Sequence, residues 1–235
     1  MKFSIDSEKI LILDFGSQYT QLIARRIREI GVYSEIVSHK ISYKEIKKNL
    51  PNGIILSGGP ESVYAKKTLT LDPEILNSNI PILGICYGMQ LIAQHFQGKV
   101  KTSKKSEFGN TSITLYQGKI LQKISNKNLN VWMSHGDKVT HLPKGFKKIA
   151  SSKNCSIAGF ANEKHKKYGL QFHPEVTHTE KGSKILEAFI KDVCDCKAKW
   201  RSKNIVEKLI NDIRSQVGNG KVLLGISGGV DSSVA

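Results

Sequence analysis

Hydrophobic and polar positions follow two alternating periods along the first part of the chain. Short apolar runs at 9–13, 32–37 and 53–56 are typical of buried strands. After the first run, apolar residues recur at helical spacing to about Glu29, and a short helix is predicted at 43–49. This alternation of strands and helices predicts a parallel sheet covered by helices.

A different pattern begins at Gly98. From there to Gly159, short stretches of alternating apolar and polar residues are separated by Gly, Asn and Lys turns, which is typical of antiparallel strands. A strand at Tyr168–Phe172 and a helix at Glu180–Val193 complete this part. We therefore predict an α/β fold with a mostly parallel central sheet flanked by helices and a smaller antiparallel sheet.

The chain changes character again near its end. Residues Cys194–Lys203 are polar apart from Trp200, which indicates a domain boundary, and an amphipathic helix over Ile205–Ile213 and a strand over Lys221–Ile226 follow. One helix and one strand cannot close an α/β domain, so we expect the beginning of a second, longer one here. The predicted domains are 9–199 and 200–235.

The most informative stretch surrounds Cys86. The apolar run Ile82–Ile85 leads directly into apolar residues at helical spacing from Leu91, so Cys86 is predicted at a turn from strand to helix. Gly84 and Gly88 flank it symmetrically, as in a nucleophile elbow with sulfur in place of the serine oxygen. The amino terminus of the following helix favours a negatively charged sulfur. A buried structural cysteine at a strand end would also fit this stretch taken alone.

A candidate base for that cysteine is His173. Residues i and i+2 of an extended chain face the same side, so the side chains of His173 and Glu175 can lie together. Pro174 favours this geometry because it disfavours helix at the residue before it. The pattern predicts a triad in which Cys86 attacks, His173 transfers the proton and Glu175 orients the imidazole.

Several separated motifs carry a family resemblance. The stretch Gly84–Gln90, followed much later by His173–Glu175, resembles the class I glutamine amidotransferases, which have a flavodoxin-like fold. Further segments resemble the bacterial GMP synthases within that family, and the resemblance extends over essentially the whole chain. These segments are Leu13–Thr20, Leu56–Ser62, Trp132–Val139 and His173–Thr179. The segment Ser106–Gly109 departs from the pattern, because the family commonly has Arg before the Glu.

The resemblance also implies roles for residues around the triad. The backbone N–H groups of Gly59 and Tyr87 are expected to form the oxyanion hole. Gln90, Ser134 and His135 are expected to contact the bound glutamine. No metal is expected at this site.

A second motif closes the chain. It lacks the Lys-bearing phosphate-loop pattern and resembles the pyrophosphate-binding loop of the N-type ATP pyrophosphatases, in which backbone amides and a helix amino terminus hold phosphates. The residues expected to bind ATP are Ser227, Gly228, Gly229, Val230, Asp231, Ser232 and Ser233. The resemblance implies ATP, Mg²⁺ and xanthosine monophosphate (XMP) as further ligands, GMP as product, a homodimer and a cytoplasmic enzyme.

Composition changes this interpretation little. The net charge of +16 suggests a nucleic-acid partner at first. However, 31 of the 36 basic residues are Lys and are scattered along the chain, whereas sequence-specific sites rely on Arg and on clustering. We therefore expect no nucleic-acid partner.

The four cysteines and the hydropathy pattern indicate the compartment. Cys86, Cys155, Cys194 and Cys196 form no paired framework and have no metal-ligand spacing. No apolar run approaches the ~20 residues of a membrane span, and the polar start is unlike a signal peptide. We expect no membrane partner and a reducing cytoplasm, which keeps Cys86 reactive.

Two other functions fit part of the pattern. Another class I amidotransferase subunit, such as that of anthranilate synthase, would share the triad, but it has no place for the Ser227–Ser233 motif. A non-catalytic module on the same fold would need no intact Cys86, His173 and Glu175.

Overall fold

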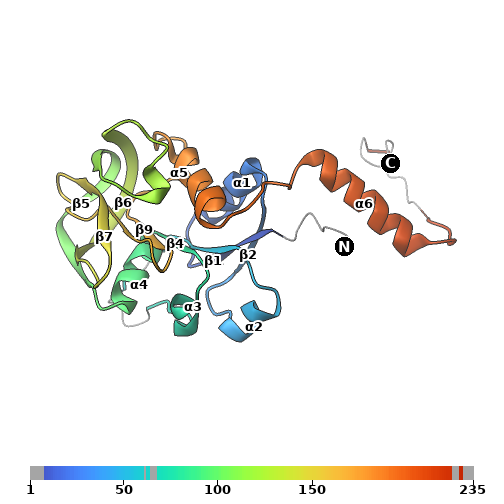
Figure 1. Cartoon of the computed structure of the whole chain (residues 1–235), viewed down its shortest axis with the longest axis horizontal. Helices are drawn as coiled ribbons and strands as arrows, with labels where there is room; N and C mark the ends of the chain where they lie inside the picture. The colour runs from blue at the N-terminus through green and yellow to red at the C-terminus, as the bar shows by residue number, and fades with distance from the viewer. Residues whose placement is uncertain (1–7, 61, 64–67, 224–227, 230–235) are drawn as a thin grey trace. The chain divides into compact units, whose positions relative to one another are not determined.

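The computed structural model describes residues 8–60, 62–63, 68–223 and 228–229 (Figure 1). The chain divides into two compact units, Met1–Trp200 and Arg201–Ala235. We describe each unit by itself.

The described residues of the first unit form one nine-stranded mixed sheet with the strand order β2-β1-β3-β4-β9-β8-β7-β5-β6. The parallel strands are β1 (Lys9–Asp14), β2 (Tyr33–Ser38), β3 (Gly53–Leu56), β4 (Ile82–Ile85) and β9 (Lys167–Leu170). The antiparallel strands are β8 (Gly159–Asn162), β7 (Lys147–Ser152), β5 (Lys99–Leu115) and β6 (Asn128–His141).

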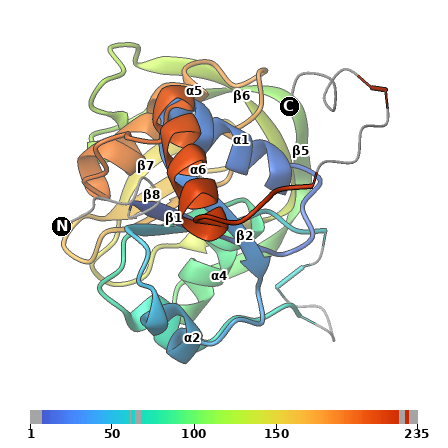
Figure 2. The ribbon, with the colours of Figure 1, turned by 90° about the vertical axis from the view of Figure 1, so that its right-hand side faces the viewer.

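Helices cover both faces of the parallel strands. Alternate residues of β1 face opposite sides, as the period of a strand requires. Ile10 and Ile12 pack in one core cluster with α1 (Thr20–Ile30) and α5 (Gly182–Ala188). Leu11 and Leu13 pack in a second cluster with α2 (Tyr43–Lys48), α3 (Pro73–Asn77) and α4 (Tyr87–His95). Figure 2 shows these two layers above and below the sheet. The predicted fold class is confirmed.

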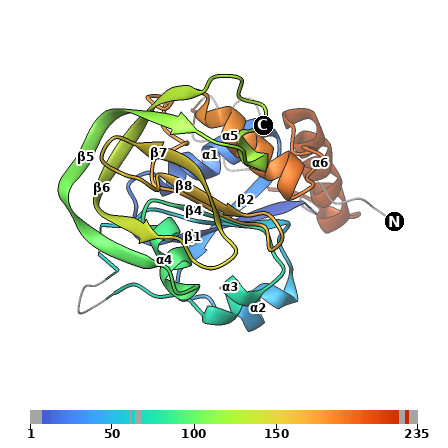
Figure 3. The same cartoon turned by 60° about the vertical axis from the view of Figure 1, so that its left-hand side comes forward.

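The antiparallel strands differ in detail from the prediction. We expected short strands in a smaller sheet, whereas β5 has 17 residues and β6 has 14. These two strands pair along most of their length and curve around one end of the unit (Figure 3). They continue the central sheet because β9 pairs with β4 on one side and with β8 on the other.

The first unit ends with a helix and an anchored segment. The helix expected at Glu180–Val193 is formed by α5 and a π-helical turn at Phe189–Val193. Beyond it, the N–H of Trp200 donates to the carbonyl of Gly31 at 2.7 Å, and the Trp200 ring lies 4.8 Å from that of Tyr33. Among the described residues, no helix has the length and apolar character needed to cross a membrane.

In the second unit, the described structure is the helix α6 (Ser202–Val217). Its apolar side chains are largely exposed, namely Val206, Leu209, Ile210 and Ile213. The strand predicted at Lys221–Ile226 is not formed over Lys221–Leu223, and its remaining residues lie outside the described part. A strand requires a neighbouring strand for its backbone hydrogen bonds, and a propensity for extended structure does not supply one.

Candidate active site

Cys86 lies between β4 and α4, as predicted, in a strained backbone conformation. Its φ of +50° and ψ of −104° are unfavourable for a residue with a side chain. A Cβ at Gly84 would lie 2.4 Å from the carbonyl carbon of Gly88, and one at Gly88 would lie 2.5 Å from the oxygen of Leu56. The two glycines are therefore needed for the close approach of strand and helix, and the predicted elbow geometry is confirmed.

His173 and Glu175 form the pair that the i, i+2 spacing predicts. His173 Nδ1 donates to Glu175 Oε1 at 2.7 Å, and both side chains are buried. Burial by itself would lower the pKa of His173. The hydrogen bonds with Cys86 and Glu175 outweigh this effect and raise the pKa to about 10. The imidazole is therefore protonated at neutral pH and offers N–H groups on both sides.

Neighbouring groups hold this pair in place. Thr179 Oγ1 donates to the carbonyl of His173 at 2.6 Å, and Arg26 Nε donates to the carbonyl of Glu175 at 3.0 Å. The Tyr19 ring lies edge-on to the imidazole with the ring centres 5.1 Å apart. Glu175 Oε2 is buried without a hydrogen-bond partner among the described residues. The positive charge of the His173 imidazole is thus the main group that offsets the negative charge of the buried Glu175 carboxylate.

Cys86 and His173 line a common cavity of about 260 Å³, together with Tyr19 and Ser134. Both lie against Gly58, where an added Cβ would be 3.3 Å from His173 Cε1 and 3.7 Å from Cys86 Cβ. The structure thus brings together side chains that are far apart in the sequence.

A second cavity, of about 340 Å³, is also lined by Cys86. Its lining includes Gly59, Tyr87 and Gln90 and the residues 134–137. Cys86 and Ser134 line both cavities, and Cys86 Sγ lies 3.4 Å from the carbonyl oxygen of Ser134. Cys86 thus lies where the two cavities share lining residues.

Gln90 contacts groups that the sequence did not single out. Its Nε2 donates to the carbonyl of Asp137 at 2.9 Å and lies 3.4 Å from Oε1 of Gln171. Gln171 Nε2 in turn lies 3.6 Å from Cys86 Sγ. Gln171 stands two residues before His173, so strand alternation is a signal that could have found it.

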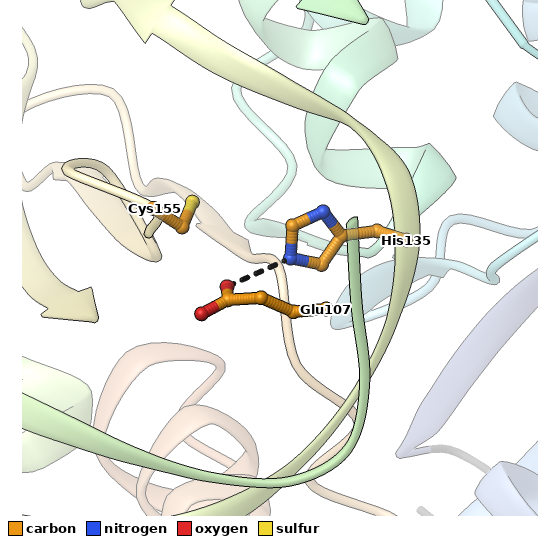
Figure 4. Close-up of side chains that lie close together, drawn as sticks. All are labelled: Glu107, His135 and Cys155. Carbon is orange, nitrogen blue, oxygen red and sulfur yellow. Dashed lines mark hydrogen bonds and ion pairs between the residues drawn. The ribbon is translucent and has the colours of Figure 1, made fainter. Parts of the chain in front are cut away.

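The structure contains a second group of the same residue types, formed by Glu107, His135 and Cys155 (Figure 4). His135 Nε2 lies 3.2 Å from Glu107 Oε2, and one ligand atom from each of the three residues lies within 4.8 Å of the others. Cys155 is fully buried, and burial raises the pKa of its thiol to about 12. This thiol is held as a neutral donor to the carbonyl of Ile157 at 3.3 Å. Such a cysteine is not a nucleophile.

The carboxyl-terminal motif is described at two positions. Gly228, with φ of +78°, and Gly229 are part of a bend. The other residues expected to bind ATP, Ser227 and 230–233, lie outside the described residues.

Comparison with known protein families decides the assignment. Residues 11–193 match the model of the family named glutamine amidotransferase class-I. The chain belongs to this family. The matched residues include Cys86, His173 and both cavities.

Curated proteins resemble the chain over its whole length. The chain is 52% identical over 238 aligned residues to a glutamine-hydrolysing GMP synthase of Ruthia magnifica and 51% identical over 234 to one of Staphylococcus epidermidis. Each alignment covers 100% of this chain, but only 46% and 45% of those two proteins. The chain thus spans about half the length of these curated relatives.

Solved structures of amidotransferases agree with this fold. A protein of Thermoplasma acidophilum, described as one of the subunits of a GMP synthase, is 33% identical, with a TM-score of 0.71 over 86% of this chain and 98% of that one. A glutamine amidotransferase of Thermotoga maritima is 21% identical, with a TM-score of 0.58 over 90% of this chain and 93% of that one. The second similarity concerns the fold alone.

Proposed function

We propose that this chain is the glutamine-hydrolysing part of a GMP synthase, with Cys86, His173 and Glu175 as its catalytic triad. The main support is the position of Cys86 at a strained turn where it lines two cavities, beside a buried imidazolium and carboxylate. An imidazolium beside a cysteine stabilises the thiolate, which is the nucleophilic form.

In the proposed first step, the thiolate of Cys86 attacks the side-chain amide carbon of glutamine. The carbonyl oxygen becomes an oxyanion, which the N–H groups of Gly59 and Tyr87 stabilise. As the bond between carbon and nitrogen breaks, His173 gives its proton to the nitrogen, which leaves as ammonia. The product on the enzyme is a γ-glutamyl thioester. Glu175 orients the imidazole and balances its charge throughout.

The second step regenerates the enzyme. Water attacks the thioester carbon while neutral His173 takes its proton, and the thiolate of Cys86 leaves as glutamate forms. The cavity lined by Gln90 and by Ser134 and His135 holds the amino-acid end of glutamine. The cavity on the His173 side admits water and releases ammonia.

The curated relatives, which are about twice as long, support a proposal for the whole protein. There, ATP with Mg²⁺ adenylylates the 2-oxygen of XMP, and ammonia displaces AMP to give GMP, with pyrophosphate as the other product. Residues Ser227–Ser233 would hold the departing phosphates at the start of an ATP pyrophosphatase domain. The full-length protein would be a cytoplasmic homodimer.

The decisive experiment uses Cys86→Ala in the full-length enzyme. GMP formation from glutamine should disappear, whereas GMP formation from added ammonium salts should persist, because the nucleophile serves only to release ammonia. The assay follows GMP with each nitrogen source. Equal loss of both activities would contradict the proposed division of labour.

A further inference from the structure

The strand pair β5–β6 is irregular at the edge of the 340 Å³ cavity. Thr102 pairs with Asp137, but the next pair along β5 is Glu107 with His135. Four residues of β5, 103–106, therefore lie opposite Gly136 alone. Within the segment 134–137, which lines the cavity, Gly136 therefore has no paired residue in β5, and the ladder of backbone hydrogen bonds is irregular at this point.

Side-chain contacts reinforce this irregular part of the ladder. The His135 ring spans two oxygens: Nε2 lies 3.2 Å from Glu107 Oε2, and Nδ1 lies 3.1 Å from the carbonyl of Asp137. Glu107 is only 5% exposed and His135 only 4%. Ser152 Oγ donates to the Glu107 carboxylate at 2.8 and 3.0 Å, and it accepts from the N–H of Cys155 at 2.8 Å. Glu107 is therefore fixed from β7 as well as from β6.

These contacts continue to the reacting sulfur. The carbonyl of Asp137 that faces His135 also accepts the hydrogen bond from Gln90. Gln90 contacts Gln171, which contacts Cys86. A displacement of Glu107 would thus also displace His135 and the residues of the cavity wall that it contacts.

Metal binding does not account for the cluster of Glu107, His135 and Cys155. Each of the three side chains already has a hydrogen-bond partner within the protein, and Ser152 shares the carboxylate. Of the three residues, the cavity beside Cys86 reaches only His135. The hydrogen bonds within the cluster account for its geometry without an ion.

We propose that Glu107 is a positioning residue for glutamine: by accepting the Nε2–H of His135 it fixes this imidazole and, with it, the cavity wall at 134–137. This role rests on the proposed function, because it concerns the binding of glutamine in that cavity. Phe108, the next residue of β5, points to the opposite face, is 71% exposed and lines the same cavity. Glu107 therefore also helps to fix the side chain of Phe108 at the mouth of the cavity.

The test measures glutamine binding by calorimetry in a Cys86→Ala background, which prevents turnover. Glu107→Leu keeps the approximate volume but removes both oxygens, and it should weaken binding at least about tenfold, equivalent to about 1.4 kcal/mol. Glu107→Gln keeps an oxygen that accepts from His135 and Ser152, so binding should stay within about threefold. With Cys86 present, Glu107→Leu should raise KM about tenfold and change kcat less than about threefold.

Cys155→Ala is the matched control. This side chain belongs to the same buried cluster, but its thiol bonds to Ile157 and not to the cavity wall. It should lower the Tm and leave glutamine binding within about threefold. Unchanged binding in folded Glu107→Leu, or equal weakening in Cys155→Ala, would overturn the positioning role.

A smaller change covers the case in which Glu107→Leu does not fold. Ser152→Ala removes one hydroxyl from the anchor and should weaken binding about threefold; unchanged binding would then overturn the role. Absence of glutamine binding by the Cys86→Ala parent itself would instead overturn the proposed function, so the two failures are distinguishable.

Discussion

The chain brings a cysteine, a histidine and a glutamate together twice, and the two groups differ in almost everything except composition. Cys86 lies at a strained turn and lines two cavities. Cys155 has no exposed surface, and its thiol is bonded to a backbone carbonyl. Residue types close together in space therefore do not define a catalytic site; backbone strain and access to substrate do.

The electrostatics of the two histidines differ in the same way. Burial lowers the pKa of both, and each has a glutamate as a neighbour. For His173, hydrogen bonds with Cys86 and Glu175 outweigh burial, whereas for His135 burial outweighs the attraction of Glu107. The raised pKa of His173 fits its proposed role as proton donor to the leaving group, whereas the lowered pKa of His135 fits a structural role.

The largest expected contrast is in thiol reactivity. At pH 7.5, a thiol with a pKa of about 12 is thiolate in only about one part in 10⁴ to 10⁵. Iodoacetamide should therefore modify Cys86 at least about 10³-fold faster than Cys155, as measured by mass spectrometry of the peptides. Both should react at similar rates in denaturant. Equal rates in the folded protein would remove the distinction between the two groups.

The next contrast compares the two glutamates. Glu175→Gln should leave the fold intact but lower kcat for glutamine hydrolysis by about 10² to 10³-fold, because a mis-oriented base loses catalysis with little loss of binding. Glu107→Gln is the control and should change kcat less than about threefold. A glutaminase assay at saturating glutamine measures both. A wild-type rate for Glu175→Gln would exclude Glu175 from the triad.

The smallest expected effect is a pH dependence of stability. Because the pKa of His173 is raised in the folded state from 6.5 to about 10, its stabilising contribution is complete below about pH 6.5 and is lost as pH rises to about 10. Between these values, the free energy of unfolding should fall more in the wild type than in His173→Gln, because only the wild type loses this proton. Urea unfolding across this range measures the difference.

His135→Gln is the control for that experiment. Because the pKa of His135 is lowered, its titration acts at acid pH, so this variant should keep the alkaline decline. A parallel alkaline profile of wild type and His173→Gln would show that His173 is not protonated in the folded state.

Local features of the site were predictable from the sequence because local rules govern them. The spacing of apolar residues places Cys86 between a strand and a helix, and the flanking glycines mark a turn too tight for side chains. The i, i+2 spacing of His173 and Glu175 places both on one side of an extended segment. Each of these inferences depends on only a few neighbouring residues.

Tertiary structure alone decided how distant segments meet. Glu107 lies 28 residues from His135 and 45 from Ser152, and their contact depends on an irregular register between β5 and β6 that no local pattern encodes. The lengths of these two strands were likewise underestimated, because pairing and burial extend them through polar residues that by themselves favour turns.

The sequence determined the fold class and the three residues of the proposed triad. Long-range packing alone decided the shape of the cavity, the link through Gln90 and Gln171, and which of two cysteines is accessible, because these depend on side chains brought together only when the sheet is complete.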